Sequence, residues 1–226
     1  TVSMIMLAFS LLILLPYFAF VFSFLNPVEI VDRIRRHTLD VIASRSGAWT
    51  VARKQREAVR GIEQLADVAL NAMESKDKGV SMASADALRS LLLQYQRLRP
   101  ELRDGWFVVE GDLAVNPDFV SMAPAVLRSV SERRIWLEMK ILRQYQTLYN
   151  EALNRMRDMN YLIAINTRSV AEAGLREGNR ELFDLAVKFF NTYLRATINA
   201  KDVRTAYNVL KQYRLLAERV PDHDDG

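Results

Sequence analysis

The sequence predicts an all-α membrane protein: an N-terminal transmembrane helix followed by a cytoplasmic bundle of amphipathic helices that includes one long, coiled-coil-like helix. Three observations lead to this fold class. Residues 2–25 carry no charged side chain. Apolar residues recur at steps of three and four through most of the remaining chain, which is the helical period. Proline and glycine are few, 6 and 8 in 226 residues, and most fall between these stretches.

The apolar stretch at residues 2–25 has the length and composition of a membrane span. At 1.5 Å per residue, a helix of this length covers roughly 36 Å, slightly more than the hydrocarbon core of a bilayer. Fifteen of its residues are Leu, Ile, Phe or Val, each favouring insertion by about 0.3–0.6 kcal/mol. A buried core helix is the alternative, but a chain this short has few helices to surround one. A signal peptide fits poorly, because no basic segment precedes the stretch and no small-residue cleavage site follows it.

Pro16 is expected to kink this span. Because the chain begins at Thr1 and not Met, further spans could precede it.

The net charge of +4 is concentrated just after this stretch. Residues 26–60 hold four acidic and eight basic residues, whereas the rest of the chain is balanced. Basic residues beside a span favour the cytoplasmic side and attract anionic lipid. We therefore expect a membrane-surface patch, not a nucleic-acid site, and a cytoplasmic body. The patch consists of Arg33, Arg35, Arg36, Arg45, Arg53, Lys54, Arg56 and Arg60.

A first helix is predicted over residues 26–44. Asn26 is a good N-cap, Pro27 suits the first helical position, and Glu29 completes a capping-box pattern. Its apolar positions Val31, Ile34, Thr38 and Val41 follow heptad spacing, which suggests self-association.

Two further helices, over residues 49–74 and 84–99, are predicted to form an antiparallel hairpin. Residues 75–79 form the polar loop between them, and Pro100 limits the second helix. The inward faces of these helices are Ala58, Ile62, Leu65, Ala66, Ala69, Leu70 and Met73 in the first and Leu88, Leu91, Leu92, Tyr95 and Leu98 in the second.

Residues 101–123 lack helical periodicity and form an irregular insert. Trp106–Val109 is a short β-type run, so either a small hairpin or an ordered loop is expected. Such long inserts often carry function. Its carboxylates could offer oxygen ligands to calcium, but their spacing does not match an EF-hand, and surface solvation is the better interpretation. They are Asp104, Glu110, Asp112 and Asp118.

The chain beyond residue 123 is predicted to be helical almost to its end. Residues 124–175 form either one helix of about 50 residues or two helices broken near Asn154 or Asn160. Helices over 180–198 and 202–220 follow, and 221–226 form a disordered tail. The expected organisation is a transmembrane helix at 1–25, a basic juxtamembrane segment at 26–60, and a helical domain at 61–220.

A short segment of the second predicted helix resembles a known family. Residues 61–70, Gly-Ile-Glu-Gln-Leu-Ala-Asp-Val-Ala-Leu, are similar to a segment of a bacterial family of predicted integral membrane proteins with a domain of unknown function. In that family an Asn-Asp-Pro-x-Thr-Ala turn follows. Residues 199–206 resemble this turn but lack the proline and lie far downstream. The resemblance implies an inner-membrane protein with several N-terminal spans and a helical body, and it implies no activity.

The candidate chemistry is sparse. Cysteine is absent, and the two histidines, His37 and His223, have no partner at metal-ligand spacing. Arg133 and Arg134 beside Trp136 could stack or bind an anionic head group. We expect no enzyme activity, no cofactor and no metal. The sequence favours a membrane-anchored scaffold or interaction subunit that assembles with itself or with a membrane complex. The alternative is a channel or transporter subunit whose pore needs several copies or upstream spans.

Overall fold

The computed structural model describes residues 12, 14, 26–44, 50–108 and 134–219, and within these residues helices are the only regular secondary structure. This confirms the all-α class. The α-helices are α2 (Pro27–Ala43), α3 (Val51–Glu74), α4 (Lys78–Leu98), α7 (Trp136–Ala152), α8 (Arg157–Arg176), α9 (Arg180–Asn199) and α10 (Val203–Ala217); two short 3₁₀ helices, η1 (Arg99–Glu101) and η2 (Asp104–Phe107), follow α4.

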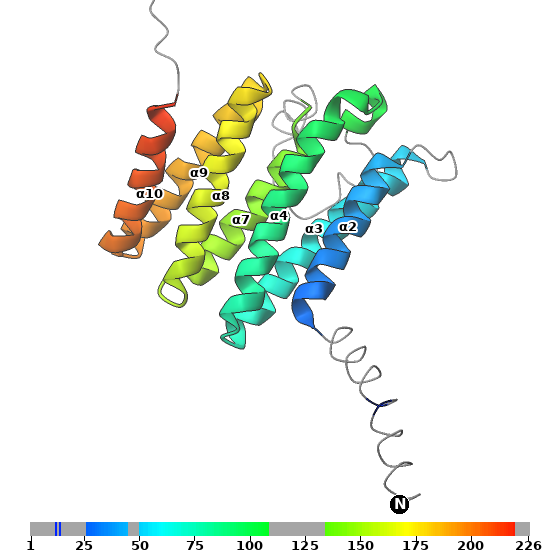
Figure 1. The fold of residues 1–226 in the computed structure, drawn as a ribbon. Coiled ribbons are helices and arrows are strands. Elements are labelled where there is room, and N and C mark those ends of the chain that lie inside the picture. The colour runs from blue at the N-terminus through cyan, green and yellow to red at the C-terminus, as the bar shows by residue number, and fades with distance from the viewer. Residues whose placement is uncertain (1–11, 13, 15–25, 45–49, 109–133, 220–226) are drawn as a thin grey trace, which may run out of the picture.

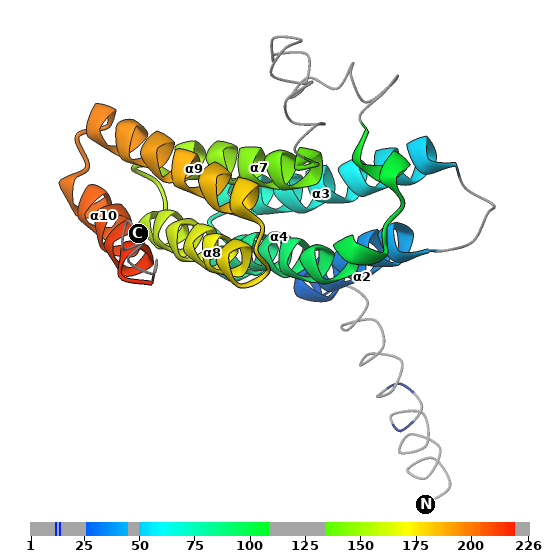
Figure 2. The same ribbon diagram turned by 90° about the horizontal axis from the view of Figure 1, so that it is seen from above.

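The helices alternate between two layers (Figures 1 and 2). One layer contains α2, α4, α8 and α10, and the other contains α3, α7 and α9. Each helix packs against its neighbours in its own layer and against the other layer, as in α-solenoids. Helices α2, α4, α8 and α10 all begin at one edge, which we call the basal edge and which is the lower edge in Figure 1. They end at the opposite, distal edge.

The core runs continuously between the two layers. Its largest fully buried side chains are aromatic, and their hydroxyl groups are hydrogen-bonded, as burial requires. The Tyr145 hydroxyl donates to the Ala85 carbonyl at 2.8 Å, and the Tyr149 and Thr197 hydroxyls lie 2.9 Å apart. The rings of Tyr149 and Tyr193 stack at 4.5 Å. Tyrosine hydroxyls thus join α7 to α4 and α9.

Three of the turns between helices share one construction. The second residue after the preceding helix has a left-handed backbone, and the residue that follows it caps the next helix with its side chain. The left-handed residues are Lys76, Gly178 and Lys201, and the caps are Asp77, Asn179 and Asp202. Each cap accepts a backbone N–H three residues on, which satisfies a donor that a helix start leaves open.

The predicted start of the third helix was wrong. The helix begins at Lys78 and not at residue 84, because the Asp77 carboxylate accepts the Val80 N–H at 3.0 Å and caps the helix there. Lys78 and Gly79, predicted to lie in a loop, belong to its first turn.

The prediction of one long, coiled-coil-like helix was also wrong for the described part of residues 124–175. Leu153 leaves helical geometry after α7, Asn154 adopts a left-handed backbone with φ 65°, and α8 begins at Arg157. This confirms the two-helix alternative with its break near Asn154. The resulting helices have 17 and 20 residues and pack against each other.

The heptad stripe of α2 lies inside the molecule. Val31, Thr38 and Val41 are buried, and Ile34 packs against the core. The surface predicted for self-association is therefore occupied by α3 and α4. Gly61 lets α3 approach α2 closely, because a Cβ on Gly61 would lie 2.0 Å from the Thr38 Oγ1.

The described part of the irregular insert contains no β-type run. Trp106 and Phe107 lie in η2 and are buried. None of the helices in the described residues combines the length and apolarity that a membrane crossing needs. The predicted span at 2–25 lies outside these residues, apart from Leu12 and Leu14, as do the tail at 221–226 and residues 109–133. The transmembrane helix stays a prediction.

Candidate functional site

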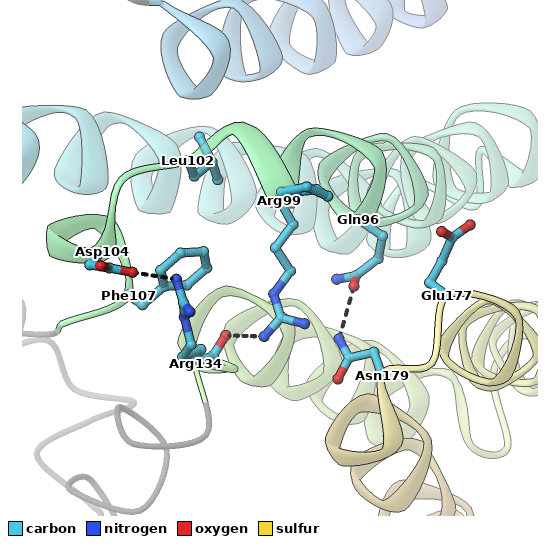
Figure 3. A pocket seen from close by; sticks show the side chains of 9 residues that line it. Gln96, Arg99, Leu102, Asp104, Phe107, Arg134, Glu177 and Asn179 are labelled. Atoms are coloured by element: carbon cyan, nitrogen blue, oxygen red, sulfur yellow. Dashed lines mark hydrogen bonds and ion pairs between the residues drawn. The ribbon is translucent and has the colours of Figure 1, made fainter.

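A polar pocket of about 510 Å³ opens at the distal edge (Figure 3). It lies where the end of α4, the two 3₁₀ helices, the segment before α7 and the α8–α9 turn meet. Pockets of this size are within the range of ligand-binding clefts. Its lining residues are Gln96, Arg99, Pro100, Leu102, Asp104, Phe107, Arg134, Glu177 and Asn179.

A chain of buried polar groups connects three helices at one side of the pocket. The Asn179 Nδ2 donates to the Gln96 Oε1 at 3.0 Å, and the Gln96 Nε2 donates to the Glu138 Oε1 at 2.8 Å. Asn179 also caps α9 by accepting the Leu182 N–H. The three side chains therefore fix the distal ends of α4, α7 and α9 relative to one another.

Glu138 is the carboxylate of this chain and is fully buried. Burial raises the pKa of Glu138, and the positive charge of Arg99 and the Gln96 hydrogen bond oppose that rise. The Arg99 Nε lies 3.7 Å from the Glu138 Oε1, while the Glu138 Oε2 has no hydrogen-bond partner. A buried carboxylate with one satisfied oxygen is costly to keep ionised.

Two arginines approach the ring of Phe107. The Arg134 guanidinium carbon lies 3.8 Å from the ring centroid and that of Arg99 lies 5.6 Å away, both within cation–π range. The Arg134 Nη2 donates to the Asp104 Oδ1 at 2.9 Å. The Arg99 Nη2 donates to the Arg134 carbonyl at 2.9 Å. Of the two roles predicted for Arg133 and Arg134, stacking is found for Arg134, on Phe107; binding of an anionic head group stays a prediction, and Arg133 lies outside the described residues.

The core holds this wall of the pocket in place. The Gln55 side chain donates to the Trp106 and Val108 carbonyls, each at 2.9 Å. The Trp136 Nε1 donates to the Trp106 carbonyl at 2.8 Å, and the two indole rings lie 5.3 Å apart. Because these donors lie on α3 and α7, η2 cannot shift without breaking contacts inside the array.

The lining side chains are suited to recognition by charge and hydrogen bonds. They supply guanidinium and amide groups and two carboxylates, those of Asp104 and Glu177. No group of three metal-ligating side chains occurs in the part of the chain that the structure describes. Such a recess can hold a polar segment of another molecule by hydrogen bonds.

The predicted basic patch is spread over α2 and α3. Arg33, Arg36, Arg53, Arg56 and Arg60 are exposed, whereas Arg35 and Lys54 are partly buried and Arg45 lies outside the described residues.

Several of these basic side chains make internal contacts. Arg35 and Arg36 pair with Asp32 at 2.6 and 2.8 Å, and the Lys54 ammonium donates to the Ser44 carbonyl at 2.6 Å. Arg60 pairs with Glu57 at 3.1 Å. The membrane-surface role of the patch stays a prediction.

The remaining candidates are not brought together. Asp104 is exposed and pairs with Arg134, while Glu110, Asp112, Asp118 and His223 lie outside the described residues. His37 is exposed on α2.

Sequence reasoning missed Glu138, Gln96 and Asn179. Glu138 did leave a signal, because it lies three and seven residues before the inward-facing Ile141 and Tyr145, where an apolar side chain is expected.

The chain was also compared with known proteins. No protein-family model, curated protein or solved structure matches it, so the resemblance of residues 61–70 stays a prediction.

Proposed function

We propose that this protein is a membrane-anchored helical scaffold, with residues 2–25 in an inner membrane and the helical array in the cytoplasm. One observation carries the proposal. Helix α2 begins at Pro27, directly after the apolar stretch, and it is an integral member of the array because Val31, Leu39 and Ile42 belong to the core. An anchor joined to such a helix would hold the whole array in one orientation.

The position of the pocket fits this role. Its lining residues lie at the distal edge, whereas α2 begins at the basal edge. A partner segment could therefore reach Arg99, Arg134 and Asn179 from the side away from the bilayer. The array also presents long, rigid faces to further partners, as helical solenoids commonly do.

The anchor is tested by extraction of membranes with alkaline carbonate. The full chain should stay in the membrane pellet, whereas a chain lacking residues 1–25 should move to the soluble fraction. Release of the full chain by carbonate contradicts the proposal. So does a truncated chain that remains in the pellet after a wash in high salt, because the salt screens basic-patch binding.

The scaffold role itself is tested by the composition of complexes in mild detergent. We expect the full chain to occur in an assembly, with itself or with another membrane protein, whose partner is lost on replacement of Arg99 and Arg134 by glutamine. Replacement of Arg97, which is exposed in the last turn of α4 and absent from the pocket, is the matched control. A stable monomer in every detergent and lipid tested would contradict this role.

A pore subunit is the second candidate. It would need residues 2–25 from several copies, so it predicts a symmetric oligomer that conducts in planar bilayers. No described residue favours it over the scaffold, and an oligomer without conductance would exclude it.

A further inference from the structure

The basal edge carries exposed apolar side chains at both of its ends. Val28 and Ile30, 43% and 38% exposed, lie in the first turn of α2 at one end. At the other end, Ile198 is 61% exposed and Val203 is 80% exposed, and these two residues flank the α9–α10 turn. The start of α2 and the α9–α10 turn lie at opposite ends of the array along the same edge (Figure 1).

At the α9–α10 turn the basic side chains are exposed and the acidic side chain is buried. Lys201 and Arg204 are exposed. The acid between them, Asp202, points inward: its side chain is 4% exposed and contacts Arg157 at 3.3 Å. It also accepts hydrogen bonds from the Thr205 N–H and hydroxyl group, at 3.1 and 2.7 Å. The exposed part of this turn therefore combines two large aliphatic side chains with two positive charges.

The other turns of the basal edge lack this combination. At the α3–α4 turn Lys78 pairs with Asp158, and the exposed Lys76 has the exposed acids Glu74 and Asp77 beside it. At the α7–α8 turn Arg155 pairs with Glu151 at 3.1 Å. Only at the α9–α10 turn, among the described turns of this edge, do exposed aliphatic and unopposed basic side chains occur together.

We propose that residues 198–204 rest on the bilayer, with Ile198 and Val203 in the head-group region and Lys201 and Arg204 near lipid phosphates. This inference rests on the proposed membrane anchor, because an anchor that ends at α2 places the basal edge nearest the bilayer. The side chains then match the two regions of the bilayer that they reach. Apolar groups enter the boundary of the acyl chains, and basic groups contact anionic head groups. Tyr207, 67% exposed one helical turn further along α10, has the amphipathic character of interfacial residues.

The absence of native cysteine permits a direct test on the full chain. Three variants, Val203→Cys, Val28→Cys and Glu181→Cys, each carry one environment-sensitive fluorophore in nanodiscs with phosphatidylglycerol. Glu181 lies in the first turn of α9 and is exposed at the distal edge, so it is the matched control. We expect an aqueous quencher to quench the labels at 203 and 28 several-fold less than the label at 181.

Charge dependence provides the second arm. Replacing Lys201 and Arg204 by glutamine should weaken docking of the turn on the order of 25-fold, about fivefold per basic residue near an anionic surface. The protection of the label at 203 should then fall, as it should in nanodiscs of phosphatidylcholine alone, while the label at 28 stays protected.

The outcomes separate this inference from the anchor. Protection at 28 with equal quenching at 203 and 181 overturns the inference and leaves the anchor standing. Quenching at all three positions overturns both. Efficient disulfide formation between two chains through Val203→Cys overturns the inference as well, because a second copy then covers the turn.

Discussion

At the scale of single residues, the buried carboxylate of Glu138 connects α7 to α4 at a cost in stability. Its pKa is raised by burial, so the folded protein binds a proton more tightly than the unfolded chain. A raised pKa contributes stability at low pH that is lost as the pH rises through the folded-state pKa. The ionised carboxylate should therefore weaken the fold at neutral pH.

The variant Glu138→Gln should expose this effect, because the amide oxygen can still accept from Gln96 without carrying a charge. We expect the free energy of unfolding of the variant, relative to the original protein, to increase as the pH rises from about 4.5 towards 7. Urea unfolding at several pH values measures it. Glu177→Gln removes an exposed carboxylate of the same pocket and is the control. A difference that does not change with pH would show that Glu138 titrates alike in both states.

Gly61 is a second residue whose identity is dictated by a neighbour. A methyl group there would lie 2.0 Å from the Thr38 Oγ1, so Gly61→Ala should destabilise the protein by about 1–3 kcal/mol through overpacking. Thermal or urea unfolding measures this. In α4, Gly79→Ala meets only Asp77 at 3.5 Å and should stabilise by up to about 1 kcal/mol, since alanine favours helix.

A double variant separates the clash from other effects of Gly61→Ala. Thr38→Ala removes the Oγ1 and Cγ2 atoms, so the combined loss should be smaller than the sum of the two single losses. Additive losses would place the cost elsewhere than in this contact.

At the scale of elements, three turns combine a residue of left-handed backbone with a side-chain cap, and the identity of the left-handed residue sets the backbone strain of the turn. Gly178 has φ 66°, and no atom lies within 4 Å of a Cβ built there. Gly178→Ala should therefore cost about 1–2 kcal/mol from backbone strain alone. Lys201 has φ 55°, so Lys201→Gly should be neutral or slightly stabilising. Equal losses for both variants in urea unfolding would refute this account.

The same turns show why element boundaries were harder to predict than the elements. Apolar periodicity identified the described α-helices, with the pair α7 and α8 as one of two alternatives, and the inward faces predicted for α3 and α4 are buried or packed against the core. The start of α4 was missed because Lys78 and Gly79 are typical of loops, while the deciding contact is the Asp77 cap. Trp106 and Phe107 have strand propensity, but Gln55, Tyr95 and Trp136 fix them as a 3₁₀ turn, and tertiary contacts override propensity.

At the scale of the whole molecule, the pocket forms because the array brings together residues that are distant in sequence. Gln96 and Asn179 are 83 residues apart in sequence, and Glu138 lies between them. They meet because α4, α7 and α9 bring their ends to the distal edge. Periodicity predicts which residues face inward on each helix, but it does not predict which helices become neighbours. The basic residues could be found from the sequence alone. The hydrogen-bonded chain of Asn179, Gln96 and Glu138 could not, because it depends on which helices are neighbours in the two layers.

The layer order also predicts where the molecule opens first. In a linear array each helix is stabilised by its neighbours. Among the described helices, α10 packs mainly against α8 and α9, whereas α4 packs against α2, α3, α7 and α8. The buried residues of α10 are Thr205, Val209, Gln212 and Leu216, of which only two are apolar. Helix α4 contributes Leu88, Leu91 and Leu92 at full burial.

Amide hydrogen exchange of the full chain in phosphatidylcholine nanodiscs should therefore show local opening of α10. We expect amides of residues 207–216 to exchange at least about tenfold faster than those of 84–95, which corresponds to an opening free energy about 1.4 kcal/mol lower. Leu216→Ala should accelerate exchange in α10 and leave α4 unchanged, because the lost contacts lie at the end of the array. Equal protection of the two helices, or an equal response to the substitution, would mean that the array unfolds as one cooperative unit.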